Sequence, residues 1–219
     1  MRRLLVCLGM LLGLAACAAE PHWAPDDAVA KAHYVSGDPP SVTLYTVVSR
    51  ETGAGGHSGL MIDGPERVLY DPAGTWYHPY SPERNDLHFG ITERMRKFYI
   101  DYHARDRWDV IEQKVPVTMA QAQQIRANAE KYGAARKSYC ANAISTVLKD
   151  VPGFGAIHHT WSPKKLSRYF SELPGATYRV YHDNDPENNT GVLMIQQTDP
   201  RAAEIREKAF ELQDGKAAN

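Results

Sequence analysis

The sequence predicts an α+β domain in which an antiparallel sheet packs against helices. Strand-like segments come first, helical segments occupy the middle, and further strand-like segments follow. The regular alternation of strand and helix that indicates a parallel sheet is missing from this order. The chain has 219 residues, of which 43% are hydrophobic and 23% charged. That size and composition are typical of a single globular domain.

Three strands are expected at the start of the domain. Residues 41–49 (SVTLYTVVS) form a β-branched run, which favours a strand. Residues 58–63 and 67–72 are two shorter strands, joined by a turn at residues 63–65 (DGP). Residues 73–90 are aromatic and contain prolines without a clear period, so we expect a loop there.

Helical spacing of apolar residues dominates the next part of the chain. Thr118 and Gln121 form a capping box, and Gly133 is placed to end the helix that follows. Ser162 precedes Pro163, a residue favoured at the first position of a helix. The expected helices cover residues 92–105, 118–132, 139–149 and 162–173, and a strand covers residues 108–117. A closing strand pair is expected at 178–182 and 192–197, followed by an amphipathic C-terminal helix and tail at 199–219.

The N-terminus has the features of a bacterial lipoprotein signal peptide over residues 1–16. Two arginines precede an apolar stretch of about eleven residues, shorter than the roughly 20 needed to span a bilayer. The stretch ends in residues 14–17 (LAAC), which match a lipobox, so Cys17 is expected to be lipidated. Several acyl chains on Cys17 would anchor the protein stably to a membrane. Ala18 favours the outer membrane, facing the periplasm. The alternative is an ordinary signal peptide in which Cys17 is incidental.

Residues 17–40 are rich in Ala, Pro, Asp and Gly and are predicted to form a lipidated N-terminus and flexible tether. The main domain is then expected to cover residues 41–198.

Cys140 stands out because the mature chain would contain no other free thiol. Cys7 is lost with the signal peptide and Cys17 carries the lipid, so an internal disulfide is excluded. Ser138 is a suitable helix cap, which would place Cys140 in the first turn of its helix. The helix N-terminus would stabilise a thiolate and offer N–H groups to an oxyanion. Alternatively, Cys140 is a buried packing residue, since apolar residues follow it at helical spacing.

His57 is the candidate base for this thiol. It follows a glycine-rich segment and opens a strand, where small neighbours leave space around the imidazole. A polar strand terminus is the alternative role for His57. Asp71 is the candidate for orienting the imidazole: with residues 63–65 as a three-residue loop, Asp71 lies directly across from His57 on the same face. A two-residue loop would move Asp71 to the other face, and a structural turn role at residues 71–72 remains equally open.

These residues resemble a known superfamily. A strand that begins His-Ser-Gly, a hairpin, Tyr-Cys-Ala-Asn-Ala-Ile at a helix start and Ser-Pro-Lys-Lys-Leu at another helix start are similar to the circularly permuted branch of the NlpC/P60 (papain-like) superfamily. The similarity covers residues 42–173. It implies a papain-like fold with Cys140 as nucleophile and His57 as base, and it places a third polar residue near Asp71. It also matches Tyr139 to an aromatic residue that would help bind the oxyanion.

Other kinds of site have weaker support. The net charge of −1, without a long block of either sign, excludes the basic footprint of nucleic-acid binding. His158, His159, His182 and Asp183 lack the spacing of a metal site, so we expect no metal and no cofactor. The aromatic residues at 76–80 and Trp161 are expected either to line a cleft or to cover the core.

The sequence therefore predicts a cysteine-dependent hydrolase of the cell envelope, of the amidase or peptidase type. The expected substrate is a peptidoglycan peptide, with a lipid or acyl ester as the second choice. An acyltransferase or lipid-ester hydrolase of the same fold is one alternative, and a non-catalytic binding lipoprotein is the other.

Overall fold

The computed structural model of the chain describes residues 19–187. The predicted signal peptide, Cys17, the strand at 192–197 and the C-terminal helix therefore lie outside the described residues. Among the residues described, no helix is both long and apolar enough to span a bilayer.

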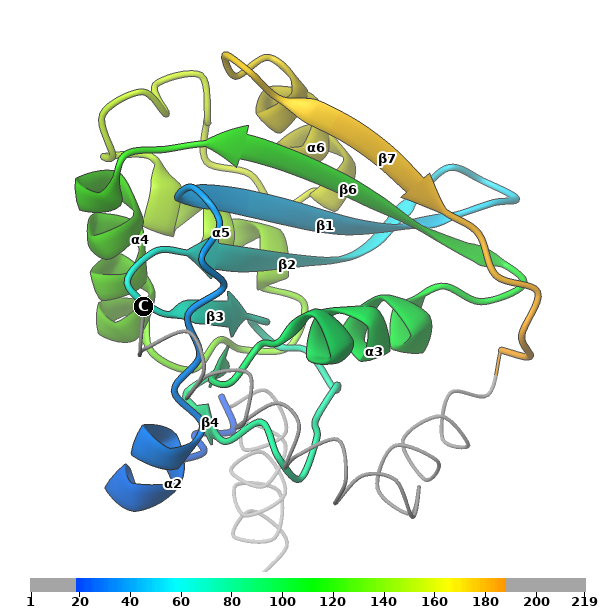
Figure 1. Cartoon of the computed structure of the whole chain (residues 1–219). Helices are drawn as coiled ribbons and strands as arrows, with labels where there is room; N and C mark the ends of the chain where they lie inside the picture. Colours follow the sequence, from blue (N-terminus) through cyan, green and yellow to red (C-terminus); the bar gives the residue numbers. More distant parts are fainter. Residues whose placement is uncertain (1–18, 188–219) are drawn as a thin grey trace, which may run out of the picture.

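Seven strands of the described part form one sheet in which every neighbouring pair is antiparallel (Figure 1). Their spatial order is β4-β5-β3-β2-β1-β6-β7. The strands are β1 (Ser41–Ser49), β2 (Gly55–Asp63), β3 (Arg67–Tyr70), β4 (Glu83–Arg84), β5 (Leu87–His88), β6 (Trp108–Pro116) and β7 (Thr177–Tyr181). The predicted α+β class with an antiparallel sheet is confirmed. The short strands β4 and β5 lie inside the segment 73–90, which was predicted to be a loop.

Helices cover both faces of this sheet (Figure 1). The apolar residues of α4, α5 and α6 pack on one face of β1 and β2, against residues such as Leu44 and Leu60. Helix α3 packs on the other face, where Tyr45 and Met61 point. The alternation of side chains along each strand produces these two cores. The helices are α2 (Asp26–Lys31), α3 (Glu93–His103), α4 (Met119–Tyr132), α5 (Cys140–Leu148) and α6 (Pro163–Ser171).

Capping residues set the ends of several helices where the sequence predicted them. The capping box of Thr118 and Gln121 is present, and Gly133 ends α4 with a positive φ of 76°. Ser162 caps α6 through the backbone N–H of Lys165. Helix α5 is different: it begins at Cys140 with Tyr139 as its N-cap, and its cap makes no side-chain hydrogen bond. The predicted Ser138 cap is therefore wrong, since Ser138 adopts a positive φ of 68° in the preceding turn.

The segment expected to be a tether contains ordered structure that contacts the domain. Residues 26–31 form α2, and the Ser36 hydroxyl donates to Asp63 at 2.8 Å. The carbonyl of Tyr34 accepts from the backbone N–H of Arg67 at 2.8 Å, and Arg67 also pairs with Asp38 at 2.9 Å. These polar contacts give the segment specific partners, so the part packed on the domain begins well before residue 41.

The hairpin between β2 and β3 has a different register from the predicted one. Asp63 pairs with Arg67 and Leu60 pairs with Tyr70, so the loop consists of residues 64–66. Arg67 also binds the Asp63 carboxylate at 2.7 Å, which locks this register at the turn. The register differs by two residues from the expectation, and continuing it places Asp71 opposite Gly59. A shift of two keeps every side chain on its predicted face.

Candidate active site

His57 and Asp71 are in direct contact on the α3 face of the sheet. His57 Nε2 and Asp71 Oδ1 are 2.7 Å apart. Asp71 lies diagonally from His57, across Gly59, and the missing side chain of Gly59 leaves the space between them open. A Cβ on Gly59 would lie 3.2 Å from Asp71 Oδ1. The pairing of a base with a carboxylate is thus made by a diagonal contact, where the sequence suggested a direct one.

Tyr99 of α3 completes the surroundings of this carboxylate. Its hydroxyl donates to Asp71 Oδ1 at 2.6 Å, and its ring is almost fully buried. Asp71 Oδ1 therefore accepts two hydrogen bonds, whereas Oδ2 has no partner among the described residues. Tyr99 fixes the position of the oxygen that His57 uses.

The backbone around Asp71 is held by the loop that follows β3. The N–H of Asp71 donates to the carbonyl of Asp86 at 2.8 Å, and the N–H of Gly74 donates to the carbonyl of Asp71 at 2.9 Å. A side chain at Gly74 would overlap the Asp71 carboxylate. The N–H of Ala73 also donates to the Asp86 carboxylate at 3.0 Å. This loop holds the carboxylate in a single position.

Cys140 lies at the first position of α5, close enough to His57 for the imidazole to lower the pKa of the thiol. Because Nε2 of His57 faces Asp71, the other ring nitrogen, Nδ1, is the one available to the sulfur. The backbone N–H of Ser58 also donates to the sulfur. Strand β3 ends its pairing with β2 at Leu60, so Ser58 pairs with β1 but not with β3. The thiol therefore approaches His57 beyond the end of the β2–β3 pairing.

The charges at this site favour a protonated imidazole. Burial opposes the positive charge and lowers the pKa of His57, but the Asp71 carboxylate and the Cys140 sulfur outweigh it and raise the pKa to about 10. The pKa of Asp71 is lowered below its ordinary value: burial raises it, but His57 lowers it more, by its charge and its hydrogen bond. His57 and Asp71 therefore form an ion pair near neutral pH.

The thiol of Cys140 has a pKa below its ordinary value. Burial raises the pKa, but the hydrogen bond and charge of His57, with the N–H groups of Ser58 and Ala141, outweigh burial and lower it. Cys140 is only 6% exposed, so without these partners burial would keep the thiol neutral. This combination favours a thiolate–imidazolium pair, the reactive form of a cysteine nucleophile.

Helix α5 also presents unpaired N–H groups beside the sulfur. The first N–H groups of any helix lack partners within it. In α5 the first helical backbone hydrogen bond runs from the N–H of Ala143 to the carbonyl of Tyr139. The N–H groups of Cys140 and Ala141 therefore lie at the sulfur without being used by the helix. A negatively charged oxygen formed at this position would find donors already in place.

The other side of the His57 ring is covered by His103. The two imidazoles are stacked, with centroids 5.4 Å apart and an interplanar angle of 7°. Burial and the charge of His57 lower the pKa of His103 to about 4, with Asp71 opposing, so His103 is neutral at physiological pH. His103 Nδ1 also lies 2.8 Å from the carbonyl of Tyr99. A neutral ring of this kind restricts the rotation of His57 without adding a competing charge.

An aromatic pair borders the cysteine. The ring of Tyr139, directly before Cys140, packs edge-on against Trp161 at 4.3 Å between centroids, and Trp161 is 54% exposed. The start of α6 closes on the start of β2, because a Cβ on Gly55 would lie 2.7 Å from Pro163. Trp161 precedes this contact and borders the site, whereas Trp76 is buried in the core beneath α3.

Groups that could hold a metal ion occur in two places among residues 19–187. One consists of His57, Asp71 and His103, and the other of Asp101, Asp183 and Asp185. In the first, the hydrogen bond between His57 and Asp71 uses the atoms that would bind an ion. Of the residues considered from the sequence, Asp183 belongs to the second group, whereas His159 contacts Asn142 and His182 contacts Asp109.

Two residues of the site, Tyr99 and His103, were not identified from the sequence. Both lie on α3, four residues apart, within the segment 92–105, for which the sequence predicted only a helix with apolar residues at helical spacing. The sequence feature that could have identified them is their spacing: Tyr99 and His103 are four residues apart, so two rings with polar atoms lie on the same face of the helix. Comparison of the chain with models of protein families, with curated proteins and with solved structures gave no match. The case for a function therefore depends on these residues and their geometry.

Proposed function

We propose that the chain is a cysteine-dependent hydrolase with a papain-like fold of the permuted NlpC/P60 type. The observation that carries this proposal is the 2.7 Å pair of His57 with the buried Asp71, next to a Cys140 thiol that lies at a helix N-terminus and whose pKa His57 lowers. A cysteine kept only for packing would not need a buried imidazole, a buried carboxylate and two backbone N–H groups around it.

In the proposed reaction, the Cys140 thiolate attacks the carbonyl carbon of an amide or ester, and a C–S bond forms while the carbonyl oxygen takes the negative charge. The N–H groups at the start of α5, assisted by Tyr139, bind this oxyanion. The C–N or C–O bond then breaks, and the leaving group takes the proton from His57. Water next gives a proton to His57 and attacks the thioester, which releases the acid and restores the thiolate. Asp71 keeps the imidazole oriented throughout, and no cofactor takes part.

The proposed location is the outer membrane, facing the periplasm, with Cys17 as the lipidated anchor. This proposal rests on the lipobox of the sequence. The substrate class that fits this location is a peptide amide of peptidoglycan, with a lipid or other acyl ester as the second candidate. Either substrate would approach past Tyr139 and Trp161, and the exposed ring of Trp161 offers a surface for apolar or planar groups.

The test uses p-nitrophenyl acetate as a general acyl donor. The purified protein should release more than one equivalent of p-nitrophenol, and mass spectrometry of a quenched sample should find an acetyl group on Cys140. Cys140→Ala should abolish both signals, and His57→Ala should reduce turnover strongly. His182→Ala is the matched control, since His182 forms a comparable 2.7 Å pair with Asp109 away from the site.

A binding protein without catalysis is distinguished by the same experiment. It would give no acylated Cys140 and no release above the Cys140→Ala background, and that result would contradict the hydrolase proposal. Incubation with purified peptidoglycan, followed by chromatography of the released peptides, then tests the substrate class.

A further inference from the structure

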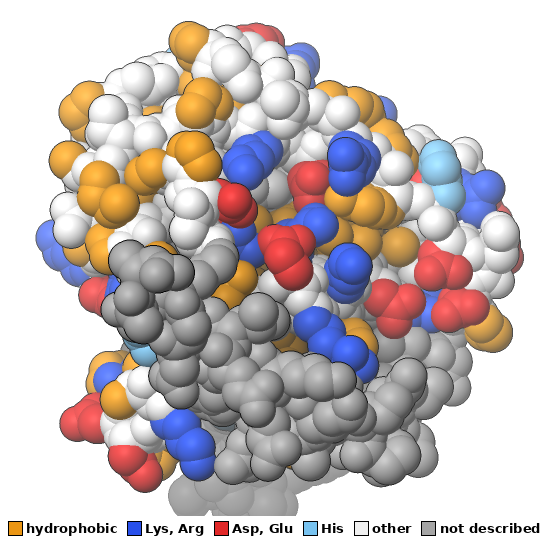
Figure 2. Space-filling view, in the orientation of Figure 1, with side chains coloured by type: hydrophobic (Ala, Val, Ile, Leu, Met, Phe, Trp, Pro, Cys, Tyr) orange, Lys and Arg blue, Asp and Glu red, His pale blue; other side chains and the backbone are white. Residues whose placement is uncertain are grey.

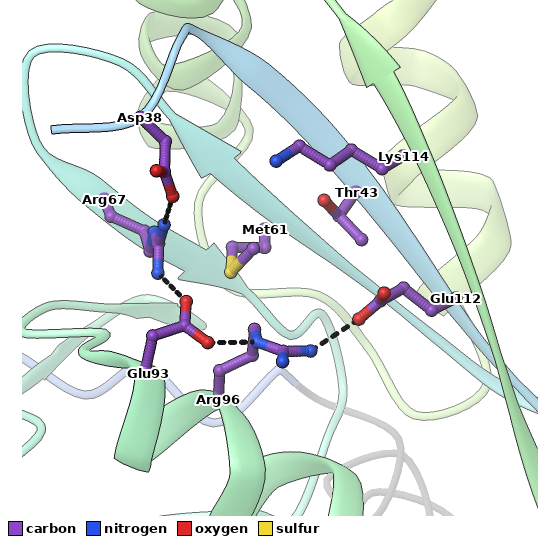
Figure 3. A pocket seen from close by; sticks show the side chains of 8 residues that line it. All are labelled: Asp38, Thr43, Met61, Arg67, Glu93, Arg96, Glu112 and Lys114. Carbon is purple, nitrogen blue, oxygen red and sulfur yellow. Dashed lines mark hydrogen bonds and ion pairs between the residues drawn. The ribbon is translucent and has the colours of Figure 1, made fainter. Parts of the chain in front are cut away.

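A polar pocket of about 250 Å³ lies on the α3 face of the sheet, apart from Cys140 (Figure 3). Its lining residues come from the segment before β1, from β1, β2, β3 and β6, and from the first turns of α3. They are Asp38, Thr43, Met61, Arg67, Glu93, Arg96, Glu112 and Lys114. None of them belongs to the set around His57.

One wall of this pocket is an alternating chain of charges. Arg67 binds both Asp38, at 2.9 Å, and Glu93. Arg96 binds Glu93 at 3.0 Å and Glu112 at 2.6 Å. The residues of this chain of charges that line the pocket are three carboxylates and two guanidinium groups, and Arg67 is also shared with the buried Asp63, so this wall has an excess of negative charge.

The opposite wall contains a cation and a hydroxyl group that have no protein partner in the described part of the chain. Lys114 is exposed and makes no ion pair among residues 19–187, and its amine points toward the pocket (Figure 3). Thr43 lies opposite Lys114 on the neighbouring strand. Thr43 is only 1% exposed, and its hydroxyl has no hydrogen-bond partner in this part of the structure.

A buried hydroxyl without a partner costs free energy. The Thr43 oxygen points into the pocket beside the Lys114 amine (Figure 3), so a ligand group bound there would satisfy it. The group that suits an ammonium and a hydroxyl donor together is a carboxylate.

The same pocket offers an acceptor for a positive group. Glu112 lies two residues before Lys114 on β6, and both side chains line the pocket. Its Oε2 accepts from Arg96 and from the Tyr181 hydroxyl, whereas Oε1 has no partner among the described residues. An ammonium group bound near Oε1 would also offset the excess negative charge of the first wall.

The face that carries the pocket has the charge pattern this arrangement needs. Basic and acidic side chains alternate in the centre of the view in Figure 2, without a large area of either sign. A surface built for a polyanion would have basic groups in excess. The alternation favours a ligand that carries both charges.

We propose that this pocket binds a small zwitterion, an amino acid or a short peptide, with its carboxylate on Lys114 and Thr43 and its ammonium at Glu112. The volume suits a ligand of this size and is below the range typical of drug-sized ligands. The site is independent of the hydrolase reaction proposed above.

The test measures binding of glycine and of glycylglycine to the full chain by isothermal titration calorimetry, up to about 20 mM, which covers millimolar affinity. The two probes distinguish a free amino acid from a peptide. Acetate and methylammonium each carry one of the two charges and should bind at least about tenfold more weakly than the better zwitterion. Lys114→Met and Thr43→Val should each weaken binding of that zwitterion by about tenfold or more.

The controls separate loss of the site from loss of the fold. Thr46→Val removes an equally buried, unpartnered hydroxyl from the opposite face of β1, and Lys165→Met removes an exposed lysine from α6. Both should leave binding unchanged. The midpoint temperature of thermal unfolding of Thr43→Val should equal or exceed that of the wild type, because the lost hydroxyl has no partner among the described residues. The proposal is overturned if neither zwitterion binds, if acetate binds equally well, or if Thr43→Val and Lys114→Met bind like the wild type.

Discussion

The hydroxyl of Tyr99 occupies the space in which a side chain at residue 59 would lie, so a Cβ on Gly59 would overlap it. Gly59 thereby allows a residue of α3 to reach a carboxylate at the end of β3. The sheet and the helix meet at this glycine.

Gly59→Ala should therefore disturb both stability and reactivity. The added methyl group must displace Tyr99, Asp71 or the strand, and overpacking of this kind costs about 1 to 3 kcal/mol in the free energy of unfolding. Thermal or urea denaturation measures this loss. Gly155→Ala is the control, because a Cβ there meets nothing within 4 Å. Equal stability of the two variants would contradict the close approach at Gly59.

The Cys140 thiol should react over a wide pH range. Its lowered pKa means that thiolate is present below the ordinary value of 9.0, and His57 stays protonated until the pH approaches about 10. Alkylation by iodoacetamide should thus rise with pH through the lowered thiol pKa and then stay level. In His57→Ala only burial and the backbone N–H groups act on the sulfur, so the rise should move toward higher pH. A profile shared by wild type and His57→Ala would exclude the ion pair.

In Asp71→Asn, the dependence of the alkylation rate of Cys140 on pH should lie between those of the wild type and His57→Ala. The amide can still accept a hydrogen bond from Nε2, but it lacks the charge that raises the pKa of His57. With burial then acting against the imidazolium, His57 should lose its proton at lower pH, and the thiolate should lose its partner. Alkylation rates between pH 5 and 9 test this order. Reactivity equal to the wild type would remove Asp71 from the proposed set.

Tyr99→Phe should act mainly on stability. It removes one of the two donors to the buried Asp71 oxygen, and loss of a donor to a buried charge costs about 1 to 3 kcal/mol. The alkylation profile should change less than in Asp71→Asn, since the pairing of His57 with Cys140 is kept. Tyr102→Phe, on the same helix, loses only a neutral contact with Thr75 and serves as the control. A stability change no larger than that of the control would argue against the role of Tyr99.

Arg67 should be one of the residues most sensitive to substitution. Its side chain is 2% exposed and contacts Asp63, which is equally buried. Arg67→Met leaves the Asp63 charge buried without this partner, which costs about 3 to 5 kcal/mol in unfolding free energy. Arg107→Met breaks an ion pair with Glu51 in which both side chains are more than half exposed, and should destabilise the fold far less than Arg67→Met. Chemical denaturation compares the two directly.

Cys17→Ser should release the protein from membranes or block its maturation, because the lipid on Cys17 is the expected anchor. Cell fractionation with immunoblotting measures this. Unchanged size and membrane fraction in Cys17→Ser, and in cells treated with the lipoprotein signal-peptidase inhibitor globomycin, would contradict the lipobox prediction.

The sequence by itself determined the elements whose signals are local. The β-branched run of β1, the capping box of α4 and the Ser-Pro start of α6 each depend on a few neighbouring residues, and the structure confirms them. For the β2–β3 hairpin, a three-residue loop predicted Asp71 on the face of His57 and a two-residue loop predicted the other face. The structure has a three-residue loop, so Asp71 lies on the face of His57.

The tertiary structure decided what depends on contacts between distant residues. The register of the hairpin was settled by the bond between Arg67 and Asp63 at its turn, which moved Asp71 opposite Gly59. The partnership of Tyr99 with Asp71, 28 residues apart, arises from the packing of α3 on the sheet. Apolar periodicity tells which side of a helix is buried, but it does not tell which polar atom that side will meet, because this depends on how the whole helix lies across the strands.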